Sequence, residues 1–344
     1  MKLYSDNGYL NIEAVLNIDV PFIFVVGGRG TGKTFGALKY VVDNDKRFMF
    51  MRRTQSQLDL INKPEFSPFK PLNSAYKWDI TSESITKYNA GFYHSHETDN
   101  GRIEAVGAPL GYSCALSTVS NLRGFDASDI ELLIYDEFIP EKHERPIKNE
   151  GPALLNAYET MNRNRELEGK KPLKLLCLAN ANDLGNPIFM ELNLIGKAEN
   201  MRRKEQELSI DYTRGIALII LTKSPISDAK ASTALYKLAA GSEYSDMALA
   251  NTFAELKTDN IKSMPLSEYK AIVTVGEITI YKHKANKTYY VSTHCTGSPE
   301  SFTTSDIDLK RFYRKYSYVL DSYMNNKVYF ENSMCEILLT KYVI

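Results

Sequence analysis

The octapeptide at residues 27–34, GGRGTGKT, constrains the fold of this chain more than any other segment. It matches the phosphate-loop pattern GxxxxGK[ST] over its full length. The apolar run Phe22–Val26 precedes it, and residues 34–43 carry apolar side chains at helical spacing. A strand, this loop and a helix in succession form the unit that binds nucleotide phosphates. The alternative is a glycine-rich turn with an accidental Lys-Thr pair, and the flanking strand and helix argue against it.

Each residue type in this loop has a physical role in phosphate binding. The glycines let the backbone wrap around the phosphates, so that successive N–H groups and the helix N-terminus face the negative charge. Lys33 is expected to reach the β- and γ-phosphates, and the hydroxyl of Thr34 is expected to hold Mg²⁺. The sequence therefore assigns nucleotide binding to Gly27, Gly28, Arg29, Gly30, Thr31, Gly32, Lys33 and Thr34.

A second motif supplies acidic residues at the end of another apolar run. Residues 132–137 read LLIYDE, so two carboxylates follow a predicted buried strand. Parallel sheets bind ligands at this edge, and Asp136 fits a carboxylate that holds Mg²⁺ through water. Glu137 is placed to accept a proton from an attacking water, which makes hydrolysis the expected reaction. The alternative is a solvated strand end.

Three further observations bear on the nucleotide site. The guanine-reading motif NKxD is not satisfied by residues 62–65, which read NKPE and lie too early in the chain, so ATP is favoured over GTP. Asn180 follows the predicted strand 174–179, where its amide can sense the γ-phosphate or orient water, or can simply form a turn. Arg52 and Arg53 end another strand, and either contact with the nucleotide or solvation of the strand end is compatible with that position.

Arginines that act across a subunit boundary are the next candidates, because ring ATPases often insert an arginine into a neighbour's site. Arg163 and Arg165 end the helix predicted for residues 152–168 and project in different directions, so one can serve a neighbour while the other is structural. Arg123 lies beside a glycine turn before the acidic strand. A solvated or salt-bridged surface arginine is the alternative for each.

The alternation of strand and helix patterns predicts the fold class. Residues 1–200 are predicted to form an α/β ATPase domain with a doubly wound, mostly parallel sheet, with a small antiparallel excursion between residues 76 and 106. Residues 201–255 are polar and helical in pattern, which predicts a linker or lid. Residues 256–344 contain alternating β-type segments and predict a small α+β domain.

Composition excludes some classes of function. The chain has 42 Lys and Arg residues against 42 Asp and Glu residues, which argues against a basic protein that coats nucleic acid. No apolar signal segment and no stretch long enough to span a bilayer is found, and the four cysteines show no metal or disulfide spacing. We expect a reduced, cytoplasmic environment and no membrane partner.

Taken together, these motifs resemble those of the viral DNA-packaging ATPases of the φ29-like kind, small relatives of the large terminases of phages. The resemblance is carried by GGRGTGKT at 27–34, YDEF at 135–138, NRNRE at 162–166 and CLAN at 177–180, with a weaker match in GSEYSDMALANTF at 241–253. It covers most of the first 250 residues in order. The two nucleotide motifs are generic, whereas the ordered set with YDEF, RNRE and CLAN is much more specific.

This resemblance implies a P-loop ATPase of the ASCE class that hydrolyses ATP with Mg²⁺ to move double-stranded DNA into a procapsid. It implies a homo-oligomeric ring, a pentamer in that family, docked on the portal or connector of the procapsid in the host cytoplasm. A structural RNA is a further candidate partner. By motif position it implies that Arg163 is the finger acting on the adjacent subunit, and Arg123 is a looser match to a second basic residue that acts in trans.

The resemblance also implies that residues 256–344 form a vestigial, RNase H-like nuclease domain. Active nucleases of that fold need clustered carboxylates for two metal ions, and the expected first strands offer only Glu268 and Glu277, so we expect no DNA cleavage. The domain has 12 basic and 9 acidic residues and is expected to bind DNA phosphates instead. The candidate contacts, each of which is equally compatible with an ordinary solvated surface, are Lys282, Lys284, Lys287, Lys310, Arg311, Arg314 and Lys315.

Two other classes of function remain open at this point. A helicase-like P-loop ATPase acting on nucleic acid or protein is one, although no motifs of a second motor domain follow residue 200. A nucleotide-dependent switch that does not hydrolyse ATP is the other, and Glu137 argues against it.

Overall fold

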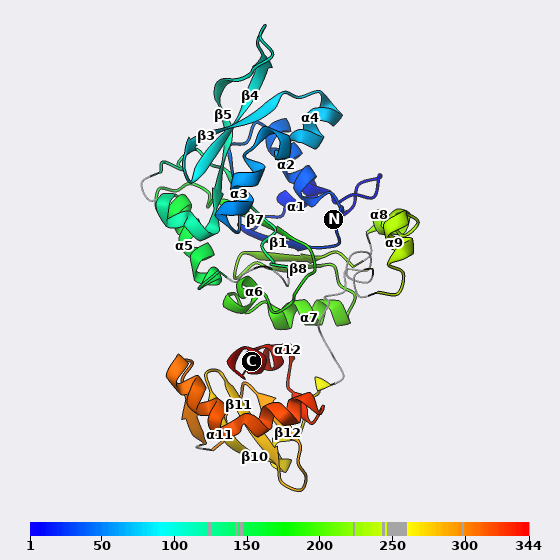
Figure 1. Cartoon of the computed structure of the whole chain (residues 1–344), viewed down its shortest axis with the longest axis vertical. Helices are drawn as coiled ribbons and strands as arrows, with labels where there is room; N and C mark the ends of the chain where they lie inside the picture. The colour runs from blue at the N-terminus through cyan, green and yellow to red at the C-terminus, as the bar shows by residue number, and fades with distance from the viewer. Residues whose placement is uncertain are drawn as a thin grey trace. The chain divides into compact units, whose positions relative to one another are not determined.

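The strand that ends at the phosphate loop lies inside a nine-stranded sheet in the computed structural model, which describes residues 1–122, 125–141, 144, 147–222, 224–242, 245, 260–297 and 299–343 (Figure 1). The chain divides into two compact units. The first contains Met1–Leu192 and Asn200–Ala254, and the second contains Asn193–Glu199 and Glu255–Ile344.

The large sheet of the first unit is mostly parallel. Its spatial order is β3-β4-β5-β2-β6-β7-β1-β9-β8, and the five neighbouring pairs from β5 to β9 are all parallel. The predicted doubly wound, mostly parallel sheet is thereby confirmed. The strands are β1 (Phe22–Val26), β2 (Phe48–Arg52), β3 (Ile80–Thr86), β4 (Asn89–Glu97), β5 (Ile103–Ala115), β6 (Leu132–Asp136), β7 (Lys174–Ala179), β8 (Leu208–Asp211) and β9 (Ile216–Ile220).

Helices cover both faces of this sheet. Apolar residues of α1, α2 and α4 pack with Ile23, Val25 and Phe50 on one face. On the other face, Phe24 packs edge-on against Phe138 and against Phe189 of α6, which contacts α5. The helices are α1 (Ile12–Leu16), α2 (Lys33–Asp43), α3 (Gln55–Ile61), α4 (Lys70–Tyr76), α5 (Glu150–Asn162), α6 (Pro187–Glu191), α7 (Ile195–Arg203), α8 (Pro225–Ala231) and α9 (Ala234–Leu238), with 3₁₀ turns η1 (Pro64–Phe66) and η2 (Leu116–Leu122).

The antiparallel excursion expected between residues 76 and 106 is present as β3, β4 and β5. These strands pair in antiparallel fashion, and the last of them turns back into the parallel sheet beside β2. In Figure 1 the hairpin of β4 and β5 extends beyond the layer of helices.

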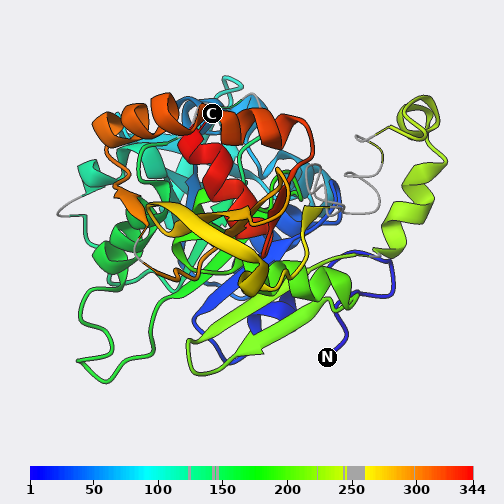
Figure 2. The same cartoon turned by 90° about the horizontal axis from the view of Figure 1, so that it is seen from below.

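The predicted boundary at residue 200 was wrong, because the sheet continues past it. β8 and β9 form an antiparallel hairpin at the edge of the sheet (Figure 2), and β9 pairs in parallel with β1. All five residues of Ile216–Ile220 are buried, so the apolar run that is too short to span a membrane is a core strand. Among the described residues from 201 to 242, the helices are the end of α7 together with α8 and α9, and residues 243, 244 and 246–259 lie outside the described residues.

The second unit is a small α+β domain, as predicted. Strands β10, β11 and β12 form an antiparallel meander, β13 adds in parallel to β10, and β14 adds in parallel to β12. The RNase H-like assignment stays a prediction. The elements are η4 (Leu266–Glu268), β10 (Tyr269–Val275), β11 (Ile278–His283), β12 (Tyr289–Ser292), β13 (Glu300–Phe302), α11 (Asp306–Met324), β14 (Val328–Phe330) and α12 (Ser333–Val343).

Two acidic residues of the second unit matter for nuclease chemistry. Glu268 precedes β10 and Glu277 follows it, so the seven-residue strand separates them by more than ~20 Å. These two carboxylates therefore do not share a metal ion. None of the described helices, in either unit, is long and apolar enough to cross a membrane.

Candidate functional site

The phosphate loop joins β1 to α2, and its curvature depends on glycine. Gly30 and Gly32 have φ angles of +68° and +85°, in the left-handed region that other residues avoid. Gly32 also directly precedes α2, and a Cβ there would lie 3.0 Å from Cδ1 of Tyr9. The backbone is therefore bent in the manner that the sequence motif predicts.

Lys33 is buried at the start of α2, with 8% of its surface exposed. Its ammonium donates to the carbonyl oxygens of Gly27 at 3.0 Å and Gly28 at 2.7 Å. It also donates to the side-chain oxygen of Asn180 at 3.3 Å, which places the end of β7 beside the loop. Burial lowers the pKa of Lys33 to about 7, against the opposing attraction of Asp136. An anion bound here would restore the ordinary charge of this lysine.

Thr34 and Asp136 lie together at the edge of the sheet. The Thr34 hydroxyl donates to Oδ1 of Asp136 at 2.8 Å, and Asp136 is only 4% exposed at the end of β6. A hydroxyl and a carboxylate oxygen are hard donors of the kind that Mg²⁺ prefers. Among the described residues there is no group of three His, Cys, Asp or Glu side chains that could hold a metal. The donor set therefore fits Mg²⁺ shared with phosphate oxygens and water, as in other phosphate-loop sites.

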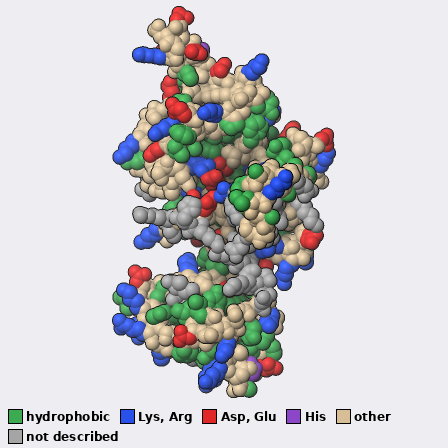
Figure 3. Space-filling view, turned by 45° about the vertical axis from the view of Figure 1, so that its right-hand side comes forward, with side chains coloured by type: hydrophobic (Ala, Val, Ile, Leu, Met, Phe, Trp, Pro, Cys, Tyr) green, Lys and Arg blue, Asp and Glu red, His purple; other side chains and the backbone are tan. Residues whose placement is uncertain are grey.

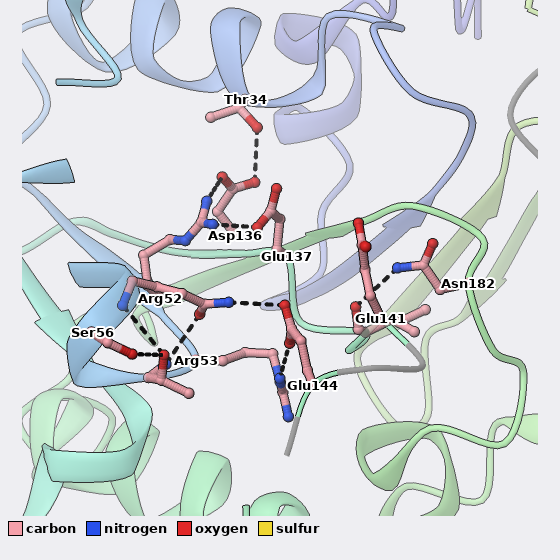
Figure 4. Close-up of polar contacts among 12 residues, drawn as sticks. Thr34, Arg52, Arg53, Ser56, Asp136, Glu137, Glu141, Glu144 and Asn182 are labelled. Carbon is pink, nitrogen blue, oxygen red and sulfur yellow. Dashed lines mark hydrogen bonds and ion pairs between the residues drawn. The ribbon is translucent and has the colours of Figure 1, made fainter. Parts of the chain in front are cut away.

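Glu137 follows Asp136 and has a positive φ of 56°. Arg52, at the end of β2, forms an ion pair with Glu137 and also donates to Oδ2 of Asp136 at 3.0 Å (Figure 4). Burial raises the pKa of Glu137 above its ordinary value, and the charge of Arg52 lowers it in part. The sequence left the role of Arg52 open, and the structure places its guanidinium on the two acids.

A cavity of about 350 Å³ lies over these groups. Residues 29–35 of the loop and helix α2, Asp136, Glu137, Glu141, Ala179 and Asn180 line it. Arg29 forms an ion pair with Glu141 at its rim. The structure thus brings together five predicted site residues, namely Lys33, Thr34, Asp136, Glu137 and Asn180. They converge because β7 lies between β1 and β6, so that three adjacent parallel strands end at one place.

Arg163 and Arg165 lie away from this cavity and differ in their surroundings. Arg163 follows the last residue of α5 and donates to the carbonyl of Phe125 at 2.6 Å, with 48% of its side chain exposed. Arg165 donates to three carbonyls, those of Ala127, Ser128 and Ile130. Arg165 therefore ties the preceding loop to the end of α5, whereas Arg163 is half exposed at the surface and pairs with the exposed Asp126 at 3.8 Å. Arg123 lies outside the described residues.

A buried ion-pair network beside the site was not anticipated. Arg53 has no exposed surface, and its guanidinium forms two hydrogen bonds with Glu150, the first residue of α5, at 2.7 and 3.0 Å. Glu150 also accepts a hydrogen bond from the Tyr135 hydroxyl at 3.1 Å, and Arg53 pairs with Glu144. Arg53 is thus a structural residue that does not contact the cavity. Successive side chains of a strand point to opposite faces of the sheet, so the sequence predicts that Arg52 and Arg53 point in opposite directions. It does not predict which of the two points toward the site.

The seven basic residues suggested for DNA contact are all exposed in the second unit. Lys and Arg side chains are visible on its surface among hydrophobic ones (Figure 3). Among the described residues, Arg311 pairs with Asp308 at 3.3 Å and Lys315 with Glu300 at 2.6 Å.

Comparison with known proteins gives consistent matches along the chain. The sequence profile of a family described as podovirus DNA encapsidation protein (Gp16) matches residues 5–310. The DNA packaging protein of Bacillus phage phi29 is 26% identical over 252 residues, which cover 71% of this chain and 66% of that protein. The DNA packaging protein of Bacillus phage B103 is 27% identical over 246 residues, which cover 70% and 66%. The match therefore spans just under two thirds of the length of these relatives.

Solved structures share the fold over nearly the whole chain. The bacteriophage Phi-29 viral genome packaging motor assembly matches with a TM-score of 0.64 and 20% identity, covering 99% of this chain and 98% of that one. The Phi-28 gp11 DNA packaging motor matches with a TM-score of 0.62 and 20% identity, covering 98% and 97%.

Proposed function

The chain belongs to the family of podovirus DNA encapsidation proteins (Gp16), and from this premise we propose that it hydrolyses ATP to drive double-stranded DNA into a viral procapsid. The relatives described as DNA packaging proteins and the shared fold with packaging motors support this proposal. We further propose that it works in the host cytoplasm as a homo-oligomeric ring, a pentamer, on the portal of the procapsid. A structural RNA is a candidate adaptor.

One observation carries the enzymatic part of the proposal. Thr34, Asp136 and Glu137 lie together beside a loop with the geometry needed to bind phosphates, and the Thr34 hydroxyl is 2.8 Å from Asp136. Bound Mg²⁺ would neutralise phosphate charge there and polarise the transferred group. Thr34 and Asp136 would hold the ion, and Glu137 would remain available to act on water. A second acid beside the metal site is the feature expected of a hydrolase.

The residues of the site divide the work of hydrolysis. The loop N–H groups and Lys33 bind the phosphates. Asn180 senses the γ-phosphate or orients the attacking water. Glu137 takes the proton of the attacking water, because burial has raised its pKa above that of a solvated glutamate. Arg52 pairs with Oε2 of Glu137, so the other carboxylate oxygen can accept this proton.

We propose that Arg163 completes the site of the adjacent subunit. Its side chain is 48% exposed at the end of α5, and it does not line its own cavity. Arg165 is committed to three backbone carbonyls and is the structural member of the pair. For DNA, we propose that the exposed lysines and arginines of the second unit contact phosphates and that this unit has no nuclease activity.

The experiment uses the full chain assembled with procapsids, ATP and double-stranded DNA. DNA packaging is measured as protection of DNA from added nuclease, and ATP hydrolysis is measured in parallel. We expect DNA and procapsids to stimulate hydrolysis, and we expect packaging to stop with non-hydrolysable ATP. Packaging that continues without hydrolysis would overturn the proposal.

Mixing subunits separates a motor from the alternatives. In a coordinated ring, a minority of Glu137→Gln subunits should inhibit the wild-type subunits more than in proportion. In a nucleotide switch or an independently acting helicase-like enzyme, activity should fall only in proportion to the added variant.

A further inference from the structure

Lys230 contacts the phosphate loop from a distant part of the chain. It lies in the last turn of α8, and its ammonium donates a hydrogen bond to the carbonyl oxygen of Arg29, 201 residues away in sequence. A Cβ at Gly30 would overlap the Nζ of Lys230 and lie 2.9 Å from its Cε. The lysine head group therefore occupies the space that the missing side chain of Gly30 leaves.

This hydrogen bond fixes the orientation of one peptide group of the loop. In a trans peptide the C=O and the following N–H point in opposite directions. Gly30 lines the cavity and Lys230 does not. Because the Arg29 carbonyl points toward Lys230, the N–H of Gly30 points away from Lys230. That N–H is a donor of the kind that a phosphate oxygen accepts in such a loop.

The charge of Lys230 is not committed to another residue among those that the structure describes. Within the part of the chain that the structure describes, the Arg29 carbonyl is its one hydrogen-bond acceptor and no carboxylate pairs with it. The Arg29 side chain differs, because it is paired with Glu141. Lys230 also adds to the positive potential at Lys33. An anion in the cavity would relieve the repulsion between these two lysines.

Helix α8 is attached to the loop through a second path. The hydroxyl of Ser224, just before α8, donates to the carbonyl of Gly8 at 3.4 Å, and a Cβ at Gly8 would lie 3.1 Å from Pro225. The same N-terminal segment binds the loop directly, since Leu10 donates its N–H to the Thr31 carbonyl at 3.0 Å. Both ends of α8 are thus linked to the phosphate loop.

We propose that Lys230 is a positioning residue for nucleotide binding, which orients the Arg29–Gly30 peptide toward the phosphates and makes α8 respond to the nucleotide. This inference rests on the proposed function, namely that the loop binds ATP. Along the chain, α8 and α9 come just before the segment that connects the first unit to the second. A nucleotide-dependent change in α8 would therefore occur where this connecting segment begins.

The first test measures nucleotide affinity. Lys230→Met keeps the length of the side chain and removes the charge and the donors. Its control is Lys237→Met, which changes an exposed lysine in the last turn of α9. We expect Lys230→Met to bind the fluorescent analogue mant-ATP about tenfold more weakly, because it loses one charged hydrogen bond. We expect no change in affinity for Lys237→Met. Lys230→Arg should retain part of the affinity, and the loss should appear in KM with little change in kcat.

The second test follows α8 by hydrogen exchange with and without ATP and Mg²⁺. In the wild type, ATP should slow exchange both in residues 28–34 and in α8. In Lys230→Met at saturating ATP, the loop should still be protected and α8 should not. If α8 is protected equally in both proteins, or if Lys230→Met binds mant-ATP as the wild type does, Lys230 has no positioning role. If the wild type itself binds no mant-ATP, the proposed ATPase function fails instead.

Discussion

Arg52 and Glu137 form an ion pair between the end of β2 and the residue that follows β6. The acid that we propose as general base is therefore held by a cation from its own subunit. Because burial raises the pKa of Glu137 and Arg52 lowers it, this pair controls how readily the base is ionised.

Replacing Arg52 should move the pH dependence of hydrolysis. A base works only when it is deprotonated, so the rate falls as the pH drops through the pKa of Glu137. Arg52→Met removes the neighbouring positive charge, raises that pKa further, and should shift the acidic limb of kcat/KM to higher pH. The kcat/KM of each protein is plotted against pH and divided by its own maximal value. Lys46→Met, which breaks a surface pair with Glu131, should leave the limb in place.

Replacing Glu137 should separate binding from hydrolysis. Glu137→Gln keeps the shape of the side chain but cannot accept the proton, so kcat should fall by about 10²–10⁴-fold while mant-ATP still binds. Single-turnover assays measure the chemical step directly. Glu141→Gln lines the same cavity, and a comparable loss in that variant would count against the role of Glu137 as base.

ATP binding should take up a proton at Lys33. The pKa of Lys33 is lowered to about 7 by burial, so at pH 8 most of this lysine is neutral in the free protein. Phosphate charge raises the pKa again, and binding at pH 8 should take up about one proton while affinity falls with rising pH above 7. Calorimetry in two buffers of different ionisation enthalpy measures the uptake. Equal apparent enthalpies in the two buffers would contradict the prediction.

Arg163 and Arg165 should fail in different ways. Arg165→Ala leaves three carbonyls without their donor and should lower the free energy of unfolding by about 1–3 kcal/mol, which a thermal melt detects. Arg163→Ala should melt like the wild type but lose hydrolysis in the assembled ring. In a single-turnover assay, which does not require the ring to cycle, mixing Arg163→Ala with Glu137→Gln subunits should restore part of the hydrolysis, because an intact Arg163 then meets an intact site. Without such recovery, Arg163 does not act in trans.

Removing one charge of the buried Arg53–Glu150 pair should lower the free energy of unfolding more than removing both charges. Both side chains are fully buried, so Arg53→Met leaves Glu150 unpaired and should cost about 3–5 kcal/mol of unfolding free energy. The double variant Arg53→Met, Glu150→Gln should recover part of this loss. Denaturant unfolding of the wild type, the two single variants Arg53→Met and Glu150→Gln, and the double variant measures the difference, and additive losses would show that the two residues do not interact.

The sequence predicted which residues lie together around the phosphate loop, and their roles stay predictions. Lys33, Thr34, Asp136 and Glu137 lie in short motifs, and the rule that parallel strands bind ligands at their carboxyl ends was enough to bring those motifs together. Asn180 was placed by the same rule. These residues could be predicted because each is fixed by its own strand and by the order of strands in a parallel sheet.

What the sequence did not predict depends on contacts between distant residues. The Arg53–Glu150 pair spans 97 residues and the Lys230–Arg29 contact spans 201, and neither leaves a local pattern. The position of β9 was missed for another reason. Its apolar run was visible, but β8 is short and partly exposed, so the surrounding polar sequence suggested helices.

Helix α5 connects two functions that would otherwise be separate. Its first residue, Glu150, is held by Arg53, which is the chain neighbour of the arginine that holds Glu137. Its last residue directly precedes Arg163, so 13 residues of helix, about 20 Å, join the two places as one rigid body. If Glu137 and Arg163 have the roles proposed above, a change at the catalytic acid of one subunit would be passed through this helix to the arginine offered to the next. Adjacent subunits joined in this way would hydrolyse ATP in a fixed order rather than independently.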